Sequence, residues 1–367
     1  MSFQSDCYFK NLHVVNFRCF EDLSLSFDKR ITLLKGGEGS GRTSVCDALR
    51  ILLCPIIYNF GGVDKFVGIN GEDFRYDGYL QMLDDLKLES WFVFDKITYL
   101  LEKAKNIDTK RVKTSTTYKC ISEEIVKKNN QLISRAKGES DFRPSFPVLL
   151  FWNANNAVCS LEEKHKEVYQ KDMLIPQKSY YGSLFRPQNF LMFRKWFYAT
   201  YSENVSIDLH NIKDIYLAKP TLNVLNDVLK KTFKRLFNKD AVEIKWKYGG
   251  FKKVDDFFVV IFLDSDGKVV SEREDEVSSM VLMVLDIVHR IIRLNAYNKD
   301  SFENILSDAT GVVILDEFEK KSSNQFINMV SLLRELFPKV QFIISCKDDC
   351  EIQADEEIGV VELPKQG

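Results

Sequence analysis

The chain has 367 residues, of which 45% are hydrophobic and 13% aromatic, and it carries a formal net charge of −2. This composition is typical of a folded protein with one or two domains, and the slightly acidic balance excludes nucleic-acid binding driven by overall positive charge. No apolar run of about 18 residues is present to span a bilayer, and the first residues lack an apolar signal region, so we expect a soluble, cytoplasmic protein. The eight cysteines include no CxxC pair, which predicts reduced thiols.

A glycine-rich loop near the N-terminus is the first functional motif. An apolar run at 31–34 precedes the sequence Gly36-Gly37-Glu38-Gly39-Ser40-Gly41-Arg42-Thr43-Ser44, and apolar residues with helical spacing follow at 45–53. Strand, glycine loop and helix in this order predict the phosphate-binding pattern G-x-x-x-x-G-K-[ST], in which backbone N–H groups surround the phosphates and a hydroxyl binds Mg²⁺. We expect the nucleotide to contact Gly36, Gly39, Ser40, Gly41, Arg42, Thr43 and Ser44.

One residue of this loop departs from the pattern, because Arg42 replaces the lysine. Arginine keeps the positive charge but carries a wide planar fork in a cradle shaped for a compact ammonium group. The loop therefore indicates a nucleotide site that is detuned for hydrolysis. A plain glycine turn between a strand and a helix is the alternative, and a second motif makes it the weaker one.

The second motif is a short apolar run at 311–315 that ends in Asp316 and Glu317. It predicts a buried parallel strand, and ligands of open α/β sheets lie at the carboxyl ends of such strands. We expect Asp316 to hold Mg²⁺, directly or through water, alongside Thr43, and Glu317 to act as the general base that accepts a proton from the attacking water. Alone, this segment would be better explained as a strand that ends in a solvated acidic turn.

With both motifs, the chain resembles the ATP-binding-cassette-like (ABC-like) ATPases of the SMC, RecF and OLD group, and especially the bacterial family described as predicted ATP-binding proteins involved in virulence. Residues 12–23 resemble the opening L-x-x-x-N-F-R-x-F-x-x-L, residues 337–347 resemble F-P-x-x-Q-F-I-V-T-T-H, and residues 147–156 and 190–197 match more loosely. The resemblance implies an α/β P-loop NTPase head with a mixed central sheet, flanking helices and an inserted helical and β region, which binds ATP and Mg²⁺. No sustained heptads are visible, so we expect no long coiled coil.

The departures from the family pattern fall where hydrolysis would be decided. Lys347 occupies the position of the histidine that contacts the γ-phosphate, where its charge would partly offset the change at Arg42, and Asn156 stands where relatives have arginine. The signature motif of the family, which binds the nucleotide of the opposite subunit, aligns with 273–276, whose carboxylates would repel a triphosphate. An alignment shifted by one turn would instead place Ser278 or Ser279 there. We expect retained or weakened ATP binding with slow or absent turnover.

The two motifs lie far apart, so we expect a split nucleotide-binding domain at 1–55 and 270–367 with an inserted lobe at 56–269. Within the lobe, the sequence predicts a strand at 91–94, a short polar helix at 120–138 and a hairpin at 257–270. Two basic stretches, at 230–239 and at 110–119, are interpreted as solvated faces rather than nucleic-acid sites.

The resemblance implies a homodimer or higher oligomer with nucleotide at the interface, acting as a switch or scaffold for a separate effector, a nuclease or toxin, in a bacterial defence or DNA-associated complex. It also keeps DNA in view as a partner. Two alternatives stay open. The first is an active ATPase in DNA repair or anti-phage defence, and the second is a non-enzymatic pseudo-ATPase that serves as an interaction subunit.

Overall fold

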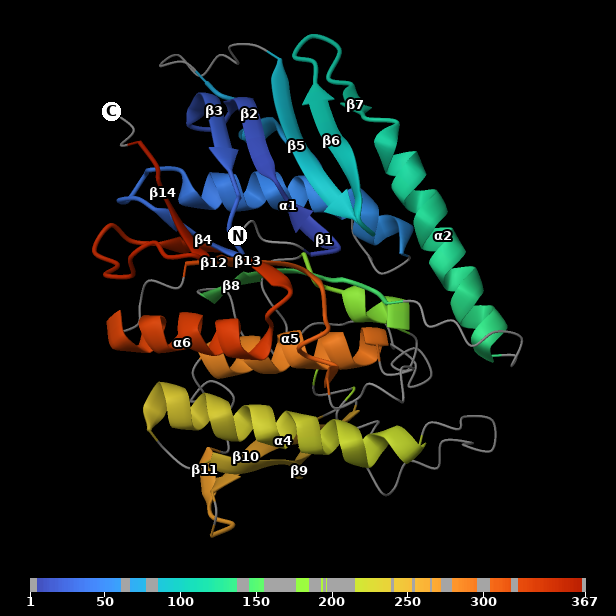
Figure 1. Ribbon diagram of the computed structural model, residues 1–367, viewed down its shortest axis with the longest axis vertical. Helices are drawn as coiled ribbons and strands as arrows, with labels where there is room; N and C mark the ends of the chain where they lie inside the picture. The colour runs from blue at the N-terminus through green and yellow to red at the C-terminus, as the bar shows by residue number, and fades with distance from the viewer. Residues whose placement is uncertain are drawn as a thin grey trace.

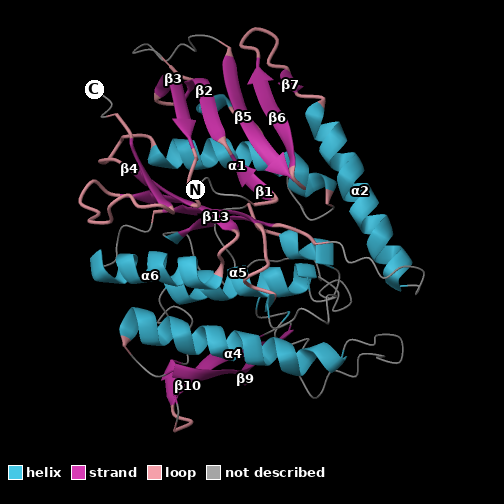
Figure 2. Cartoon of the chain, in the orientation of Figure 1, coloured by secondary structure: helices cyan, strands magenta, loops and turns pink. Residues whose placement is uncertain are grey.

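The structure is a computed structural model that describes residues 5–60, 67–76, 85–136, 145–154, 176–184, 193, 196, 215–238, 241–252, 255–264, 266–271, 279–295, 304–317 and 323–364. Its elements form successive layers (Figures 1 and 2). An antiparallel sheet lies over helix α1, a parallel sheet lies beneath that helix, and helices α5, α6 and α4 follow on the far side of the parallel sheet. The nucleotide motifs belong to the parallel sheet and to α1.

The central sheet has five strands, all parallel to their neighbours. In sheet order they are β14 (Ile358–Glu362), β4 (Ile31–Lys35), β13 (Val340–Cys346), β12 (Gly311–Asp316) and β8 (Val148–Asn153). Every residue of β8, β12 and β13 is buried, as expected for parallel strands with helices on both faces.

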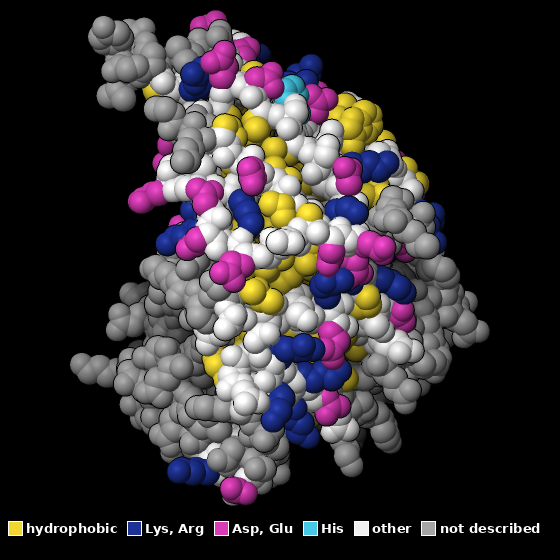
Figure 3. Space-filling model, turned by 60° about the vertical axis from the view of Figure 1, so that its left-hand side comes forward, with side chains coloured by type: hydrophobic (Ala, Val, Ile, Leu, Met, Phe, Trp, Pro, Cys, Tyr) yellow, Lys and Arg dark blue, Asp and Glu magenta, His cyan; other side chains and the backbone are white. Residues whose placement is uncertain are grey.

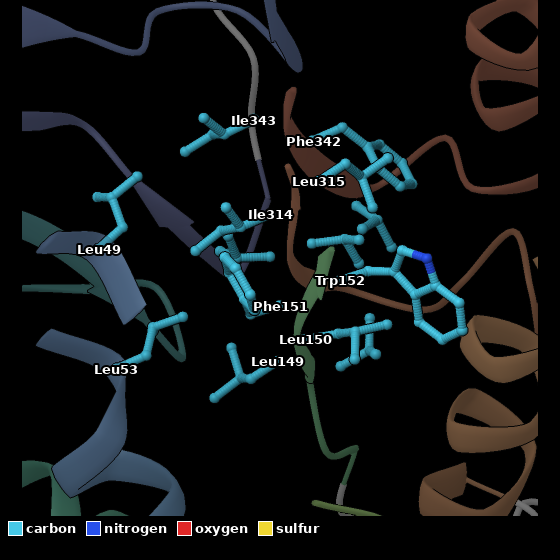
Figure 4. Close-up of a cluster of buried hydrophobic side chains, with 14 of the residues drawn as sticks. Leu49, Leu53, Leu149, Leu150, Phe151, Trp152, Ile314, Leu315, Phe342 and Ile343 are labelled. Carbon is cyan, nitrogen blue, oxygen red and sulfur yellow. The ribbon is translucent and has the colours of Figure 1, made fainter. Parts of the chain in front are cut away.

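Successive side chains of these strands point to opposite faces of the sheet (Figure 4). Phe151 and Ile314 point toward Leu49 and Leu53 of α1, whereas Trp152 points to the other face, toward the helices beneath. The same alternation, continued to the strand ends, decides which polar side chains face α1.

A second sheet is antiparallel and covers the other side of α1. In sheet order its strands are β3 (Phe20–Ser26), β2 (Asn11–Phe17), β5 (Leu86–Phe94), β6 (Ile97–Lys105) and β7 (Val112–Thr114), and β1 (Cys7–Phe9) pairs with β5. Helix α1 (Arg42–Asn59) is thus packed between two sheets, which explains why its residues are apolar on nearly every side.

The remaining elements surround this core. They are α2 (Thr117–Ala136), α4 (Ile215–Phe237), α5 (Ser279–Asn295), α6 (Ser323–Leu336), the short 3₁₀ helices η1 (Gly71–Asp73) and η4 (Pro176–Tyr180), and a three-stranded sheet of β9 (Ala241–Lys252), β10 (Asp255–Asp264) and β11 (Val269–Ser271). The longest described helix, α4, has 23 residues, so the described part of the chain contains no long coiled coil. Nor does any helix in these ranges have the length and hydrophobicity needed to cross a bilayer.

The predicted strands, the polar helix and the hairpin are confirmed, but the strands are divided between the sheets differently from the prediction. The antiparallel strands form a sheet of their own instead of joining the parallel strands in one mixed sheet. Strands β5 to β8, which lie inside the segment 56–269, complete both sheets, so that segment contributes to the nucleotide-binding core as well as to the outer elements. The boundaries of the two domains stay a prediction.

Candidate nucleotide-binding site

The glycine loop connects β4 to α1, as the sequence predicts, and its shape depends on glycine at two positions. Gly41 has a φ of +86°, and a Cβ added there would lie 2.3 Å from Cζ of Phe20 and 2.6 Å from Sγ of Cys19, in the turn between β2 and β3. A Cβ at Gly36 would lie 2.2 Å from the Ser40 hydroxyl across the loop. The loop is therefore closed on itself and covered by the β2–β3 turn, with no room for a side chain at Gly36 or Gly41.

The loop has the features of a phosphate site. It ends at the N-terminus of α1, an 18-residue helix whose first backbone N–H groups and dipole favour an anion. The hydroxyl of Ser40 is buried and has no hydrogen-bond partner among the described residues, so a phosphate oxygen would satisfy it. The residues present therefore fit a nucleotide phosphate.

Asp316, the last residue of β12, is fully buried and receives hydrogen bonds from three other elements. The Thr43 hydroxyl of α1 donates to Oδ1 over 3.2 Å, the Ser345 hydroxyl of β13 donates to Oδ1 over 2.8 Å, and the Asn153 amide of β8 donates to Oδ2 over 3.3 Å. Asn153 and Ser345 lie on the strands that flank β12, at positions whose side chains face α1. We call these four side chains the carboxylate corner.

The carboxylate corner also fits Mg²⁺, which binds oxygen ligands in an octahedron. Two neighbouring ligands at about 2.1 Å from the ion lie roughly 3 Å from one another. The distance of 3.2 Å between Thr43 Oγ1 and Asp316 Oδ1 is close to that value. These two residues, predicted as the metal ligands, would hold the ion beside the phosphates, where it would neutralise their charge.

Glu317 directly follows Asp316, the last residue of β12. Its φ of +60° is unusual for a residue other than glycine, and its backbone N–H donates to the Ser345 hydroxyl over 2.9 Å. The residue is half-buried, at the same edge of the sheet as the glycine loop and the carboxylate corner. This is the place a general base needs in order to reach water near the terminal phosphate.

Three cationic residues lie at or beside the ends of β4, α1 and β13. Arg42, the first residue of α1, is half-buried, and Lys35, the last residue of β4, donates to the carbonyl of Cys350 over 2.5 Å. Lys347 is exposed just beyond the end of β13. Burial and the neighbouring thiol of Cys350 raise the pKa of Cys346, and the positive charges of Lys35 and Arg42 act against this rise. Arg42 itself begins α1 directly after the glycine loop.

The structure brings most of the predicted site residues to one edge of the parallel sheet. Gly39, with a φ of +79°, lies in the loop, and Ser44 is buried in the first turn of α1. Ser279 is the first residue of α5, whereas residues 273–278 and Asn156 lie outside the described residues. The described part of the chain contains no cluster of histidine, cysteine and carboxylate side chains that would hold a metal ion, including the segment with Cys346 and Cys350.

Three residues of this region were not predicted from the sequence as part of the site, namely Asn153, Ser345 and Lys35. Each lies at or beside the carboxyl end of a strand next to β12 or within β4 itself. Once the strands are paired, the alternation of side chains points Asn153 and Ser345 toward Asp316. That signal was present in the sequence, but only the strand order makes it readable.

The basic stretches behave as solvated faces. In α4, the exposed Lys231 and Arg235 pair with Glu335 of α6 at 3.2 and 2.9 Å, while Leu229 and Phe233 on the same helix are buried. In the view of Figure 3, acidic side chains lie beside basic ones in the lower half of the molecule. The second stretch is exposed around β7, with Lys110, Arg111, Lys113 and Lys119 open to solvent, and Lys239 lies outside the described residues.

A glycine loop at a helix N-terminus, with a hydroxyl and a buried carboxylate beside it on a parallel sheet, defines an ATP-binding site of the P-loop class. Residues 8–329 match the family described as an AAA ATPase domain, and the chain belongs to this family. The predicted class, a P-loop ATPase, is thereby confirmed, while the ABC-like subgroup and membership of the virulence-associated family stay predictions. No curated protein sequence matches the chain.

Several solved structures are similar to this chain over nearly its whole length. The recombination mediator protein RecF in complex with ATP is 13% identical, with a TM-score of 0.46 over 96% of this chain and 95% of that chain. The Smc head domain of Pyrococcus furiosus, bound to the C-terminal domain of ScpA, is 10% identical, with a TM-score of 0.47 over 94% and 90%. The SMC head domain of Thermotoga maritima is 12% identical, with a TM-score of 0.43 over 96% and 94%.

Proposed function

We propose that the chain binds ATP with Mg²⁺ and acts as a nucleotide-dependent switch or scaffold subunit whose hydrolysis is slow or absent. The observation that carries the proposal is a complete loop and carboxylate corner combined with two changed cations. Thr43 and Asp316 lie 3.2 Å apart beside the loop, whereas Arg42 and Lys347 stand in place of a lysine and a histidine.

The two changes affect binding and hydrolysis differently. Backbone N–H groups, the helix dipole and Mg²⁺ supply ground-state affinity for the phosphates, and none of these depends on the side chain of Arg42. Hydrolysis also needs groups aimed at the charge that develops in the transition state. A wide planar guanidinium at position 42 and a lysine at position 347 are poor replacements for the lysine and the histidine of the family pattern.

We propose further that the chain works as a homodimer or higher oligomer with nucleotide at the interface. Its effector would be a separate nuclease or toxin in a bacterial defence module, with DNA as a further partner of the complex, in the cytoplasm. The support is the family resemblance together with α5, which begins at Ser279, shortly after the aligned signature segment at 273–276. The pairing of Lys231 and Arg235 with Glu335 gives DNA no added support.

Two measurements on the purified protein test the nucleotide proposal. The first is the affinity for ATPγS, a slowly hydrolysed analogue, with and without Mg²⁺, measured by calorimetry. The second is phosphate release from ATP by the wild type and by Glu317→Gln. We expect Mg²⁺-dependent binding and little release. Release that Glu317→Gln abolishes would establish the active-ATPase alternative, and absence of binding would establish the non-enzymatic scaffold.

An Arg42→Lys variant tests whether the arginine itself limits hydrolysis. Restoring the compact ammonium should raise phosphate release by roughly tenfold or more, equivalent to about 1.4 kcal/mol of transition-state stabilisation. The matched control is Arg111→Lys, the same change at an exposed position by β7, which should leave release unchanged. Equal release rates for Arg42→Lys and wild type would show that the barrier lies elsewhere in the site.

A further inference from the structure

The hydroxyl of Ser345 connects two functional groups of the site. Ser345 is 1% exposed, near the end of β13, and its hydroxyl lies 2.8 Å from Asp316 Oδ1 and 2.9 Å from the backbone nitrogen of Glu317. A serine hydroxyl has one hydrogen, and an amide N–H can only donate. The hydroxyl therefore accepts from Glu317 and donates to Asp316, so both of its roles are fixed.

The hydrogen bond from Glu317 to Ser345 involves a residue whose backbone conformation is unfavourable. β12 ends at Asp316, and Glu317 adopts a φ of +60°, a left-handed conformation that is unfavourable for a residue with a Cβ. Such conformations persist where the surrounding structure holds them, and they are found at functional sites. The direction in which the Glu317 side chain leaves the strand depends on this backbone conformation, and the hydrogen bond to Ser345 helps to hold it.

The carboxylate of Asp316 is less dependent on Ser345. Thr43 also donates to its Oδ1, and Asn153 donates to its Oδ2. A Ser345→Ala variant would leave Asp316 with these two donors, whereas the single N–H of Glu317 would lose the bond that it makes with the hydroxyl. Removal of the hydroxyl should therefore disturb Glu317 more than Asp316.

We infer that Ser345 is a positioning residue that sets the metal ligand Asp316 and the base Glu317 relative to one another through one hydroxyl. The inference rests on the proposed function for the meaning of those two roles, but the contact itself can be tested without nucleotide. Loss of this hydroxyl should release the Glu317 backbone while the site still binds nucleotide.

The first test measures hydrogen exchange at the Glu317 amide, resolved by fragmentation mass spectrometry, in nucleotide-free protein. In Ser345→Ala this amide should exchange roughly tenfold faster than in the wild type, because its hydrogen bond is gone. Ser345→Thr keeps a hydroxyl and should restore the protection. The matched control is Ser90→Ala, which removes a buried hydroxyl bonded to the Asn11 carbonyl in the other sheet and should leave the Glu317 amide protected.

The second test separates positioning from general destabilisation. If the wild type releases phosphate, kcat should fall roughly 10- to 100-fold in Ser345→Ala, the range found when partners of metal ligands are removed. KM for ATP should change far less, and Ser345→Thr should recover most of kcat. Asn153→Ala, which removes a donor to the other oxygen of Asp316, should instead raise the Mg²⁺ concentration needed for half-maximal binding of ATPγS.

The outcomes are distinguishable. A folded Ser345→Ala protein whose Glu317 amide exchanges at the wild-type rate overturns the inference, as does a loss of kcat that Ser345→Thr does not recover. A wild type that binds no ATPγS refutes the proposed function instead, and the exchange measurement then still decides whether Ser345 holds Glu317.

Discussion

Replacing Gly41 with alanine tests how tightly the β2–β3 turn closes the glycine loop. The left-handed backbone at a φ of +86° costs an L-residue about 1–2 kcal/mol. The new Cβ would also lie 2.3 Å from Cζ of Phe20 and 2.6 Å from Sγ of Cys19, and such overpacking costs about 1–3 kcal/mol. We expect the free energy of unfolding to fall by about 2–5 kcal/mol in total.

Gly39 provides a matched control within the same loop. Its φ of +79° is nearly the same, but a Cβ added there would have no heavy atom within 4 Å. Gly39→Ala should therefore show the backbone cost alone, about 1–2 kcal/mol. The difference between the two variants, about 1–3 kcal/mol, isolates the contact between the turn and the loop.

The assay is guanidinium denaturation of the nucleotide-free protein, with the midpoints and slopes of the three proteins compared. A Phe20→Leu change removes the ring atoms nearest to the added Cβ, so the double variant with Gly41→Ala should be more stable than the sum of the single effects predicts. Equal destabilisation by Gly39→Ala and Gly41→Ala would refute the argument that the turn covers the loop.

Two further predictions concern buried titratable and charged side chains of the core. Arg18 forms ion pairs with Asp47 of α1 and Asp73 of η1, each at 2.7 Å, and both carboxylates are nearly inaccessible to solvent. Arg18→Ala should therefore lower the free energy of unfolding by roughly 3–5 kcal/mol in denaturant titrations. A loss below about 1 kcal/mol would contradict this. Burial lowers the pKa of His289 from 6.5 to about 4. Between these two pH values the unfolded chain binds a proton at His289 and the folded chain does not. Stability should therefore decrease as the pH falls from 6.5 to about 4, by about 3 kcal/mol at 1.4 kcal/mol per pKa unit, and His289→Gln should flatten this window.

The sequence predicts the nucleotide motifs well because their geometry is local. The loop at 36–44 needs glycine at particular positions, a strand before it and a helix after it, and all of these are encoded within a few residues. The strand at 311–316 is likewise recognisable from an apolar run that ends in carboxylates. Residues in such motifs act through their own backbone conformation, so they can be read without knowledge of the fold.

The partners of Asp316 could not be predicted in the same way. Asn153 and Ser345 become its neighbours because β8 and β13 flank β12 with a particular register. A shift of one residue in either pairing would turn the side chain to the opposite face of the sheet. Strand order and register depend on the packing of the whole core, and this is also why a mixed central sheet was expected where the antiparallel strands form a separate sheet.

The burial of Asp316 bears on the choice between a switch and a pure scaffold. An ionised carboxylate with no exposed surface is costly to desolvate, and hydrogen bonds from Thr43, Ser345 and Asn153 offset that cost only in part. In a protein that never binds nucleotide, an apolar residue at this position would pack between β8 and β13 at lower cost. An Asp316→Leu variant that also carries Asn153→Leu and Ser345→Ala, so that these two buried donors are not left without their acceptor, should accordingly be at least as stable as the wild type without nucleotide and should lose Mg²⁺-dependent binding of ATPγS. Such a result would mean that the carboxylate lowers stability in exchange for ligand binding, as a switch requires and a scaffold does not.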